Sequence, residues 1–391
     1  RPVLETEVLG PAREEIHNLF MEHVMAQAPG YNKLMQWTPV PIMPTPGAVG
    51  ACMQTAAKEY DMSVIGVDIG GATTDVFSVF GEYFNRTVSA NLGMSYSICN
   101  VLLEAGISNI MRWIPFSIDE GELRNRIRNK MIRPTTIPQT LEELIIEQSI
   151  AREALRLAFE HHKSLAVGLR GVHRQRTIGD TFEQTGSDET YIDMTELGML
   201  IGSGGCLSHA PRRAQSAMML IDAFQPESTT MLAVDSIFMM PQLGILSSIH
   251  PKAAMQVFDR DCLVKLGTAI APVGPSGKAE FGAPCLEVTL TVNGQTFEES
   301  VPFGSMKVIP VPQDTTAEAV IHPTRQFDVG AGYGRELKTT VNGGVVGVII
   351  DCRGRPIVLP EDVKTRNAKL VEWFLAMNMY PEESLKKYAE V

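Results

Sequence analysis

A glycine turn between two apolar segments limits the possible folds of this chain more than any other feature. The turn has the sequence D-I-G-G-A-T-T-D over residues 68–75, between the apolar runs 63–67 and 76–80. Short apolar runs joined by a tight turn predict two neighbouring strands. The run 83–88 is expected to add a third strand, so the region is predicted to form a three-stranded antiparallel meander.

The residue types in this turn suit phosphate binding. A carboxylate at the end of a buried strand, here Asp68, can hold Mg²⁺ through the waters of the ion, which dehydrates reluctantly. Two glycines let backbone N–H groups approach phosphate oxygens, and the threonine hydroxyls add donors. A plain β-hairpin with a glycine turn is the alternative. We assign the chemistry to Asp68 and Thr73, and predict phosphate contacts from Gly70, Gly71, Thr73, Thr74 and Asp75.

A second glycine turn follows the apolar run 198–201 and precedes a predicted helix. A strand that ends in glycines before a helix offers free backbone amides and space for a purine or its phosphates. Such turns are also common without any ligand. Its position, after an insertion and one strand beyond the meander, makes it the expected partner of the first turn. The residues predicted to bind the nucleoside are Gly202, Ser203, Gly204 and Gly205.

The order of predicted elements is βββα, a helical insertion at about 106–190, and then βαβα. This order predicts an α/β, ribonuclease-H-like fold whose parallel strands are covered by helices. The predicted helices span 91–104, 141–163, 209–224 and 236–247, and further strands span 198–201 and 229–234. Residues 1–60 are expected to hold N-terminal helices and a connecting helix, and residues 61–260 the nucleotide-binding lobe.

Residues 261–391 are expected to form a separate, small β-rich domain. The run 286–301 alternates around Asn293-Gly294, which is a type I′ hairpin signal. Further strands are expected at 306–311, 337–341 and 345–350, and a closing amphipathic helix at 361–377.

Composition narrows the class of protein. A formal charge of −11 argues against a dedicated nucleic-acid binder, and no apolar run reaches membrane-spanning length. Basic runs at 124–133 and 170–176 are interpreted as solvated faces. Six cysteines without a C-x-x-C pattern favour a reduced, cytoplasmic protein. Because the chain opens at Arg1 without a start signal, we expect it to be a fragment of a longer protein.

Three other features are set aside. The glycine-rich run 328–334 lacks a following Lys-Ser or Lys-Thr and is interpreted as a flexible turn. His161 and His162 are adjacent on a predicted helix, so they cannot share a face and are expected to be exposed. His209 lies just after the second glycine turn, where a base or ribose could stack, although helix capping and ordinary packing are the simpler interpretation.

These motifs resemble those of the actin/Hsp70/sugar-kinase (ASKHA) superfamily. Residues 68–75 resemble its second phosphate motif and residues 202–205 its adenosine motif, while 43–49 and 228–246 resemble its two connecting helices. More narrowly, the chain resembles the MutL/GlmL family of accessory proteins for coenzyme-B12-dependent glutamate mutase, which is distinct from the mismatch-repair MutL. The residues that carry this narrower resemblance are 43–46, 68–75, 86–88 and 91–94, and it extends over about 1–265.

The resemblance implies a function. It implies binding of ATP or ADP with Mg²⁺, and a chaperone-like or reactivating role toward a B12-dependent mutase or its cobalamin-binding subunit. The family's first phosphate motif, D-x-G-[ST]-T-x-T, is not found here, so the fragment is expected to lack the N-terminal lobe and to be inactive alone, with ATPase activity possible only in the full-length protein. A small-molecule kinase of the same superfamily and a non-catalytic nucleotide-binding scaffold remain alternatives.

Overall fold

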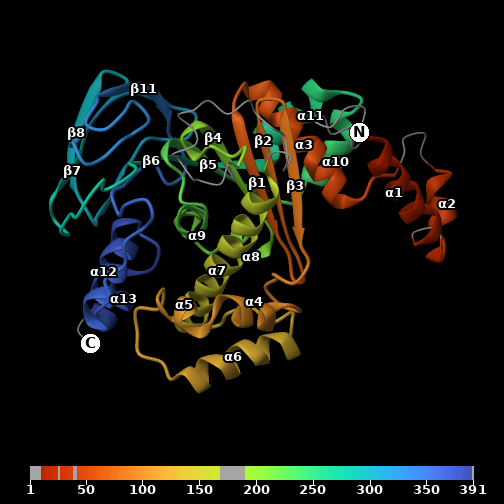
Figure 1. The fold of residues 1–391 in the computed structure, drawn as a ribbon, viewed down its shortest axis with the longest axis horizontal. Helices are drawn as coiled ribbons and strands as arrows, with labels where there is room; N and C mark the ends of the chain where they lie inside the picture. Colours follow the sequence, from red (N-terminus) through yellow and green to blue (C-terminus); the bar gives the residue numbers. More distant parts are fainter. Residues whose placement is uncertain (1–9, 25–26, 38–41, 168–189, 390–391) are drawn as a thin grey trace, which may run out of the picture.

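The structure is a computed structural model that describes residues 10–24, 27–37, 42–167 and 190–389. Its strands form two sheets (Figure 1): eight strands in the order β3-β2-β1-β4-β5-β6-β12-β9, and four in the order β11-β10-β7-β8. The strands are β1 (Ser63–Ile69), β2 (Thr74–Phe80), β3 (Tyr83–Ser89), β4 (Leu197–Ser203), β5 (Ser228–Asp235), β6 (Leu263–Ala271), β7 (Pro284–Val292), β8 (Gln295–Pro302), β9 (Met306–Ile309), β10 (Thr316–Pro323), β11 (Leu337–Asn342) and β12 (Val348–Asp351).

The α-helices lie before β1, between β3 and β6, and after β12. They are α1 (Gly10–His23), α2 (Tyr31–Met35), α3 (Thr45–Tyr60), α4 (Ile98–Ala105), α5 (Ile107–Met111), α6 (Glu120–Ile132), α7 (Leu141–Leu165), α8 (Gly205–Ser208), α9 (Arg213–Phe224), α10 (Met240–Ser247), α11 (Pro251–Val257), α12 (Val363–Ala376) and α13 (Glu382–Ala389).

Five strands of the large sheet have the predicted topology. The pairs β1–β2 and β2–β3 are antiparallel, whereas β1–β4 and β4–β5 are parallel. The crossover from β3 to β4 contains the helical insertion, and α9 connects β4 to β5. The expectation of a ribonuclease-H-like α/β fold with a helical insertion is therefore confirmed.

Side chains alternate between the two faces of this sheet, and helices cover both faces. Met199 and Ile201 of β4 pack with α3, α10 and α11, whereas Leu200 between them packs with α7 and α9. This alternation follows from the two-residue period of a strand. Because both faces are buried, the central strands are almost entirely apolar.

Three predicted helices begin later than expected. The helix expected from residue 91 begins at Ile98, the one from 209 at Arg213, and the one from 236 at Met240. Residues 90–97 and 236–239 form loops after β3 and β5, whereas residues 209–212 follow the short helix α8. The helix over 141–163 is confirmed and extends to Leu165, with Thr140 and Glu143 forming a capping box at its start.

The C-terminal region shares the large sheet. Strand β6 pairs antiparallel with β5, and β12 and β9 continue from it. The hairpin of β7 and β8 is confirmed, with positive φ at Asn293 (49°) and Gly294 (81°). Two strands, β6 and β10, were not predicted. The boundary expected at 261 remains a prediction, but it falls between two strands of one continuous sheet.

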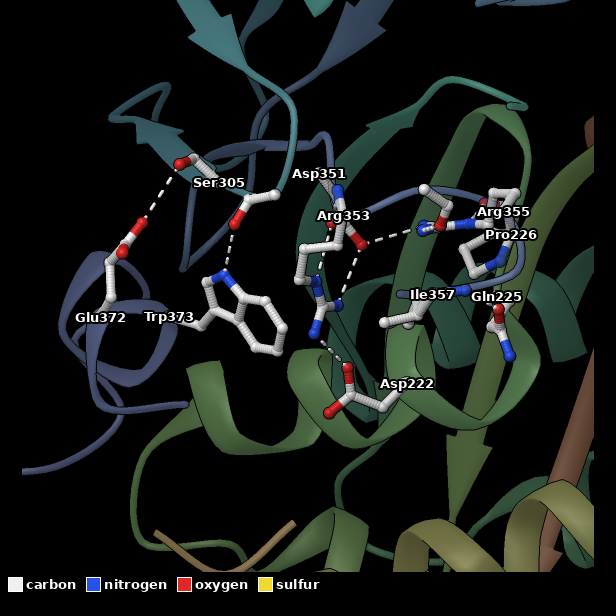
Figure 2. Close-up of polar contacts among 12 residues, drawn as sticks. Asp222, Gln225, Pro226, Ser305, Asp351, Arg353, Arg355, Ile357, Glu372 and Trp373 are labelled. Carbon is white, nitrogen blue, oxygen red and sulfur yellow. Dashed lines mark hydrogen bonds and ion pairs between the residues drawn. The ribbon is translucent and has the colours of Figure 1, made fainter. Parts of the chain in front are cut away.

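A buried set of ion pairs ties this C-terminal region to α9 (Figure 2). Arg353 contacts Asp222 of α9 at 2.7 Å and Asp351 at 2.8 Å, and Arg355 contacts Asp351 at 3.0 Å. Arg355 also donates through Nε to the carbonyl oxygen of Pro226 at 2.8 Å. The region after β12 is thus fixed to the lobe that carries the glycine turns.

Candidate nucleotide-binding site

The first glycine turn lies at the carboxyl end of β1. The N–H of Gly70 donates to the carbonyl oxygen of Thr73 at 2.8 Å, which closes the turn. The register of β1 and β2 pairs Asp68 with Asp75 across the base of the turn. The two carboxylates predicted from the sequence therefore stand opposite each other.

The loop before α4 holds this turn in place. Met94 N–H donates to the carbonyl oxygen of Gly70 and Ser95 N–H to that of Gly71, both at 2.9 Å. The hydroxyl of Thr74 is buried and donates to the carbonyl oxygen of Leu92. Residues 91–97 are therefore a brace for the turn rather than the first turns of a helix, and they leave the hydroxyl of Thr74 facing inward.

The second glycine turn lies directly against the first. Asp68 of β1 pairs with Ser203 of β4. Gly204 has φ +100°, and a Cβ built on it would lie 2.1 Å from the carbonyl oxygen of Ile69. Only glycine fits this close approach. Gly202 and Ser203 end β4, and Gly205 opens the short helix α8. The structure thus brings together the two turns that the sequence places 130 or so residues apart.

A third acidic residue, which the sequence analysis missed, lies beside them. Asp235 ends β5 and is fully buried. Its carboxylate accepts hydrogen bonds from the N–H groups of Ile237 at 3.2 Å and Met240 at 3.0 Å, at the start of α10. The sequence does contain a signal for this residue: Asp235 ends an apolar strand that directly follows the strand ending in glycines.

The surroundings of the three acids make ionisation of Asp68 and Asp75 unfavourable. Burial, followed by the negative charges of Asp75 and Asp235, raises the pKa of Asp68 to about 6. Burial also raises the pKa of Asp75, against the opposing charge of Arg86. Neighbouring carboxylates in a poorly solvated place disfavour ionisation of one another. A bound cation would remove this cost.

The donor atoms fit a hydrated Mg²⁺ and a phosphate. Among the described residues, no group of three or more His, Cys, Asp and Glu is arranged to hold a metal ion. Asp75 Oδ1 is buried and has no hydrogen-bond partner within that part of the chain. The hydroxyl of Ser203 lies beside Asp68 and lowers the pKa of that carboxyl. Buried polar atoms are nearly always satisfied, so the unpaired oxygen of Asp75 suits a water of a magnesium ion.

Two histidines and a cysteine elsewhere in the lobe differ in their surroundings. His209 is exposed after α8, and burial raises the pKa of the Cys206 thiol to about 12, so this thiol is not a reactive nucleophile. His162, expected to be exposed, is instead buried. Its ring nitrogens contact Thr87 Oγ1 at 2.9 Å and Ser78 Oγ at 2.8 Å. That correction follows from the face of α7 that packs on β2 and β3.

Comparison with known proteins identifies the family. The model of a protein family described as MutL protein matches residues 1–262. The chain belongs to the MutL protein family. This confirms the family expected from the sequence motifs, and the match includes both glycine turns.

Two individual proteins can be compared with this MutL family member. Protein MutL from Clostridium tetanomorphum is 26% identical over 286 residues, which cover 66% of this chain and 59% of that protein. The chain thus spans about three fifths of the length of this curated relative. The crystal structure of component A of (R)-2-hydroxyglutaryl-CoA dehydratase from Acidaminococcus fermentans matches with 13% identity and a TM-score of 0.30, covering 64% of this chain and 86% of that one. The latter likeness is too distant to carry an argument.

None of the helices in the part of the chain that the structure describes has the length and apolarity needed to cross a bilayer.

Proposed function

We propose that this chain is the nucleotide-binding lobe of an accessory protein that binds ATP or ADP with Mg²⁺. One observation carries the proposal: Gly204 lies so close to the carbonyl oxygen of Ile69 that the two glycine turns are in direct contact. Asp68 lies at their junction, with a pKa raised by burial and by two further acids. Two sets of backbone amides around the carboxylate of Asp68 suit a nucleotide polyphosphate and its metal.

Each residue of the site has a role in this proposal. The N–H of Gly71 and the hydroxyl of Thr73 bind phosphate oxygens, and Asp68 holds the metal through water. The N–H of Gly70, predicted from the sequence to bind phosphate, instead closes the turn on the carbonyl oxygen of Thr73. Asp75 accepts from Thr73 Oγ1 at 3.5 Å and orients it. Magnesium supplies charge neutralisation for the phosphates.

The remaining residues act through packing and position. Thr74 fixes the turn through Leu92, so its contribution is structural. The nucleoside is bound by the second glycine turn, which comprises Gly202, Ser203, Gly204 and Gly205.

Two packed helices next to the site provide a hinge. Helices α3 and α10 cross so closely that a Cβ on Gly244 would lie 1.7 Å from the carbonyl oxygen of Ala48. Asp235 accepts a hydrogen bond from the N–H of Met240, the first residue of α10. A movement of Asp235 would therefore also move α10 where it crosses α3. We infer that nucleotide binding moves a second lobe about these helices.

That motion would act on a partner protein. The MutL family membership supports a B12-dependent mutase, or its cobalamin-binding subunit, as that partner. Because a two-lobed site closes around its nucleotide, we expect a protein that carries both lobes to bind tightly and to hydrolyse ATP, and the present chain to bind weakly.

The proposal is tested by nucleotide affinity in the full-length protein. Calorimetric titration of ADP and ATP, with and without Mg²⁺, is compared for the unmodified protein, for Asp68→Asn and for the control Asp61→Asn, an exposed acid after α3. We expect Asp68→Asn to weaken Mg²⁺-nucleotide binding at least about tenfold, equivalent to 1.4 kcal/mol, and the control to leave it unchanged. Equal affinity for Asp68→Asn would contradict the proposal, and phosphorylation of an added acceptor would favour a kinase instead.

A further inference from the structure

The buried ion pairs of the C-terminal region continue into helix α7. Asp222, which contacts Arg353, also pairs with Arg152 of α7, whose Nε lies 2.6 Å from Asp222 Oδ2. Figure 2 shows the part from Asp222 to Arg355. All members are buried, and positive and negative groups alternate along the set. We name it the arginine–aspartate row; its members, in order, are Arg152, Asp222, Arg353, Asp351 and Arg355.

The row has an arginine at both ends, and the Arg355 end is fully hydrogen-bonded. Arg355 donates to the carbonyl oxygens of Pro226 and Gly354, both at 2.8 Å, and to Asp351 at 3.0 Å. Each of its three nitrogens therefore has an acceptor. Burial raises the pKa of the half-buried Glu227 nearby, and the charge of Arg355 opposes that rise. This end of the row needs no further partner.

The Arg152 end lacks acceptors. Arg152 Nη1 and Nη2 are buried and have no hydrogen-bond partner within the part of the chain that the structure describes. Gln148 lies one helical turn earlier on the same face of α7. Its Oε1 accepts from the hydroxyl of Tyr380 at 2.5 Å, whereas its buried Nε2 has no acceptor among the same residues. Three buried donor nitrogens on one face of α7 are therefore left without an acceptor.

Two aromatic rings flank the guanidinium group of Arg152. Its Cζ lies 5.6 Å from the centre of the Trp113 ring and 6.0 Å from that of Phe374. The neighbouring carboxylate of Glu153 accepts instead from Trp113 Nε1 and from Arg156 Nε, both at 2.8 Å. An aromatic ring attracts a cation that lies over its face, but it does not neutralise a buried charge.

We propose that the Arg152 end of the row binds one monovalent anion of the size of chloride. A buried charge is costly unless it is paired, and three arginines against two aspartates give the row a net charge of +1. A chloride ion brings this sum to zero. It accepts hydrogen bonds from Arg152 and from Gln148 Nε2, which are donors only. A water molecule would leave the charge in place.

The bound anion would join three parts of the molecule. Arg152 and Gln148 belong to α7 of the helical insertion, and Asp222 belongs to α9 of the lobe. Phe374 lies in α12, and Tyr380 lies between α12 and α13. The anion would therefore stabilise the attachment of the C-terminal helices to α7 and α9. The proposal is independent of nucleotide binding, since none of these residues belongs to the glycine turns.

Thermal unfolding of the 391-residue chain tests the proposal. The melting temperature is measured in sodium chloride, sodium bromide and sodium gluconate at equal ionic strength, so that screening is matched and only the small anions fit the site. We expect the melting temperature in about 0.2 M chloride or bromide to exceed that in gluconate by at least about 3 °C. Equal melting temperatures in the three salts would overturn the proposal, because a water or the aromatic rings would then suffice for Arg152.

Three variants locate the anion. Gln148→Glu supplies a carboxylate in place of the anion, so we expect it to lose the chloride effect and to melt in gluconate no lower than the unmodified chain. Arg152→Met removes the surplus charge and should also lose the chloride effect. Arg156→Met is the matched control, because Arg156 lies on the same helix and is already paired with Glu153 and Glu160. It should keep the effect. A chloride effect that persists in both Gln148→Glu and Arg152→Met would contradict the proposal.

A crystal structure with bromide gives the direct readout. Anomalous scattering at the bromine absorption edge is expected to show a peak within hydrogen-bond distance of Arg152 and Gln148 Nε2, and none there in Gln148→Glu. Two results would overturn the proposal. One is an adventitious ion only, with peaks confined to the protein surface. The other is a Gln148 amide whose Oε1 accepts directly from Arg152, because the guanidinium group would then have an internal acceptor.

Discussion

Two acidic clusters in this chain differ in how their charge is balanced. Asp222 and Asp351 lie against Arg353 and Arg355, and all four side chains are buried. Burial alone would raise the pKa of Asp351, but the charges of Arg353 and Arg355 outweigh it and lower that pKa. At the glycine turns, burial and like charges raise the pKa of Asp68 instead.

The difference separates a structural cluster from a candidate binding site. Carboxylates that are matched by guanidinium groups need no further ion, and they fix the C-terminal region to α9. Carboxylates without such a match destabilise the fold, and such an arrangement is typical of functional sites. The predictions below test this contrast.

The largest effect is expected from Arg353→Met. This change removes the guanidinium that joins Asp222 to Asp351, so that Asp222 keeps only Arg152 at 2.6 Å and Asp351 only Arg355 at 3.0 Å. Breaking these buried ion pairs should lower the free energy of unfolding by about 3–5 kcal/mol. Denaturant unfolding followed by circular dichroism measures it. Arg260→Met, at an arginine that is 87% exposed, is the matched control and should change stability by less than about 0.5 kcal/mol. A loss below about 1 kcal/mol for Arg353→Met would contradict the claim that the buried ion pairs of Arg353 stabilise the fold.

The next effect is expected where the two glycine turns meet. Gly204→Ala places a Cβ against the carbonyl oxygen of Ile69 and in a positive-φ conformation, so we expect a loss of about 2–4 kcal/mol and weaker nucleotide binding. At the neighbouring Gly205, a Cβ would meet no atom within 4 Å. Gly205→Ala should therefore be nearly neutral in stability. Equal effects in the two variants would mean that the turns are not in close contact.

Unlike the two substitutions above, Asp68→Asn should raise the free energy of unfolding at neutral pH. The folded state binds the Asp68 proton more tightly than the unfolded state does, because its pKa is raised from 3.8 to about 6. The contribution of Asp68 to stability is therefore complete below about pH 4 and lost as the pH rises through about 6.

Comparison of the two proteins across pH measures this effect. Removing the charge should stabilise the variant at pH 7.5 by about 1–3 kcal/mol, with little difference at pH 4. Thermal unfolding without Mg²⁺ at both pH values measures it. A variant that is less stable than the unmodified chain at pH 7.5 would show that Asp68 is already compensated.

The smallest effect separates two adjacent threonines. Thr74→Val removes the buried hydroxyl that donates to Leu92, and should cost about 1–2 kcal/mol. Thr73 is partly exposed and makes only a 3.5 Å contact with Asp75, so Thr73→Val should cost less than about 0.5 kcal/mol while weakening nucleotide binding. Denaturant unfolding and nucleotide titration of both variants test whether Thr74 stabilises the fold and Thr73 binds nucleotide. A larger loss of stability in Thr73→Val than in Thr74→Val would contradict this assignment.

The sequence predicted the features that depend on local pattern. Apolar runs around D-I-G-G-A-T-T-D predicted the β1–β2 turn, and Asn293-Gly294 predicted the β7–β8 hairpin. The hairpin rests on positive-φ conformations that few residue types adopt. In the first turn glycine is favoured by space instead, because a Cβ on Gly71 would lie 2.5 Å from Ser95 Oγ. The adjacency of Gly204 and Ile69 was expected only from the order of elements, and the structure supplies the contact.

Features that depend on long-range packing could not be predicted. Residues 91–97 have a helical pattern, but hydrogen bonds to Gly70 and Gly71 hold them as a loop. Strand β6 joins the large sheet through pairing with β5, which no local signal in its sequence indicates. Asp235 and the pairs of Arg353 become visible only once distant segments are placed side by side.

The central claim is that both glycine turns belong to one nucleotide site, and NMR tests it most directly. Backbone amide signals of Gly70, Gly71, Gly204 and Gly205 are followed during titration of the 391-residue chain with Mg²⁺-ADP, because chemical shifts detect even weak binding. We predict that all four amides shift together with one dissociation constant, and that Asp68→Asn abolishes the shifts. Movement of one turn without the other, or no shift at millimolar nucleotide, would contradict the account.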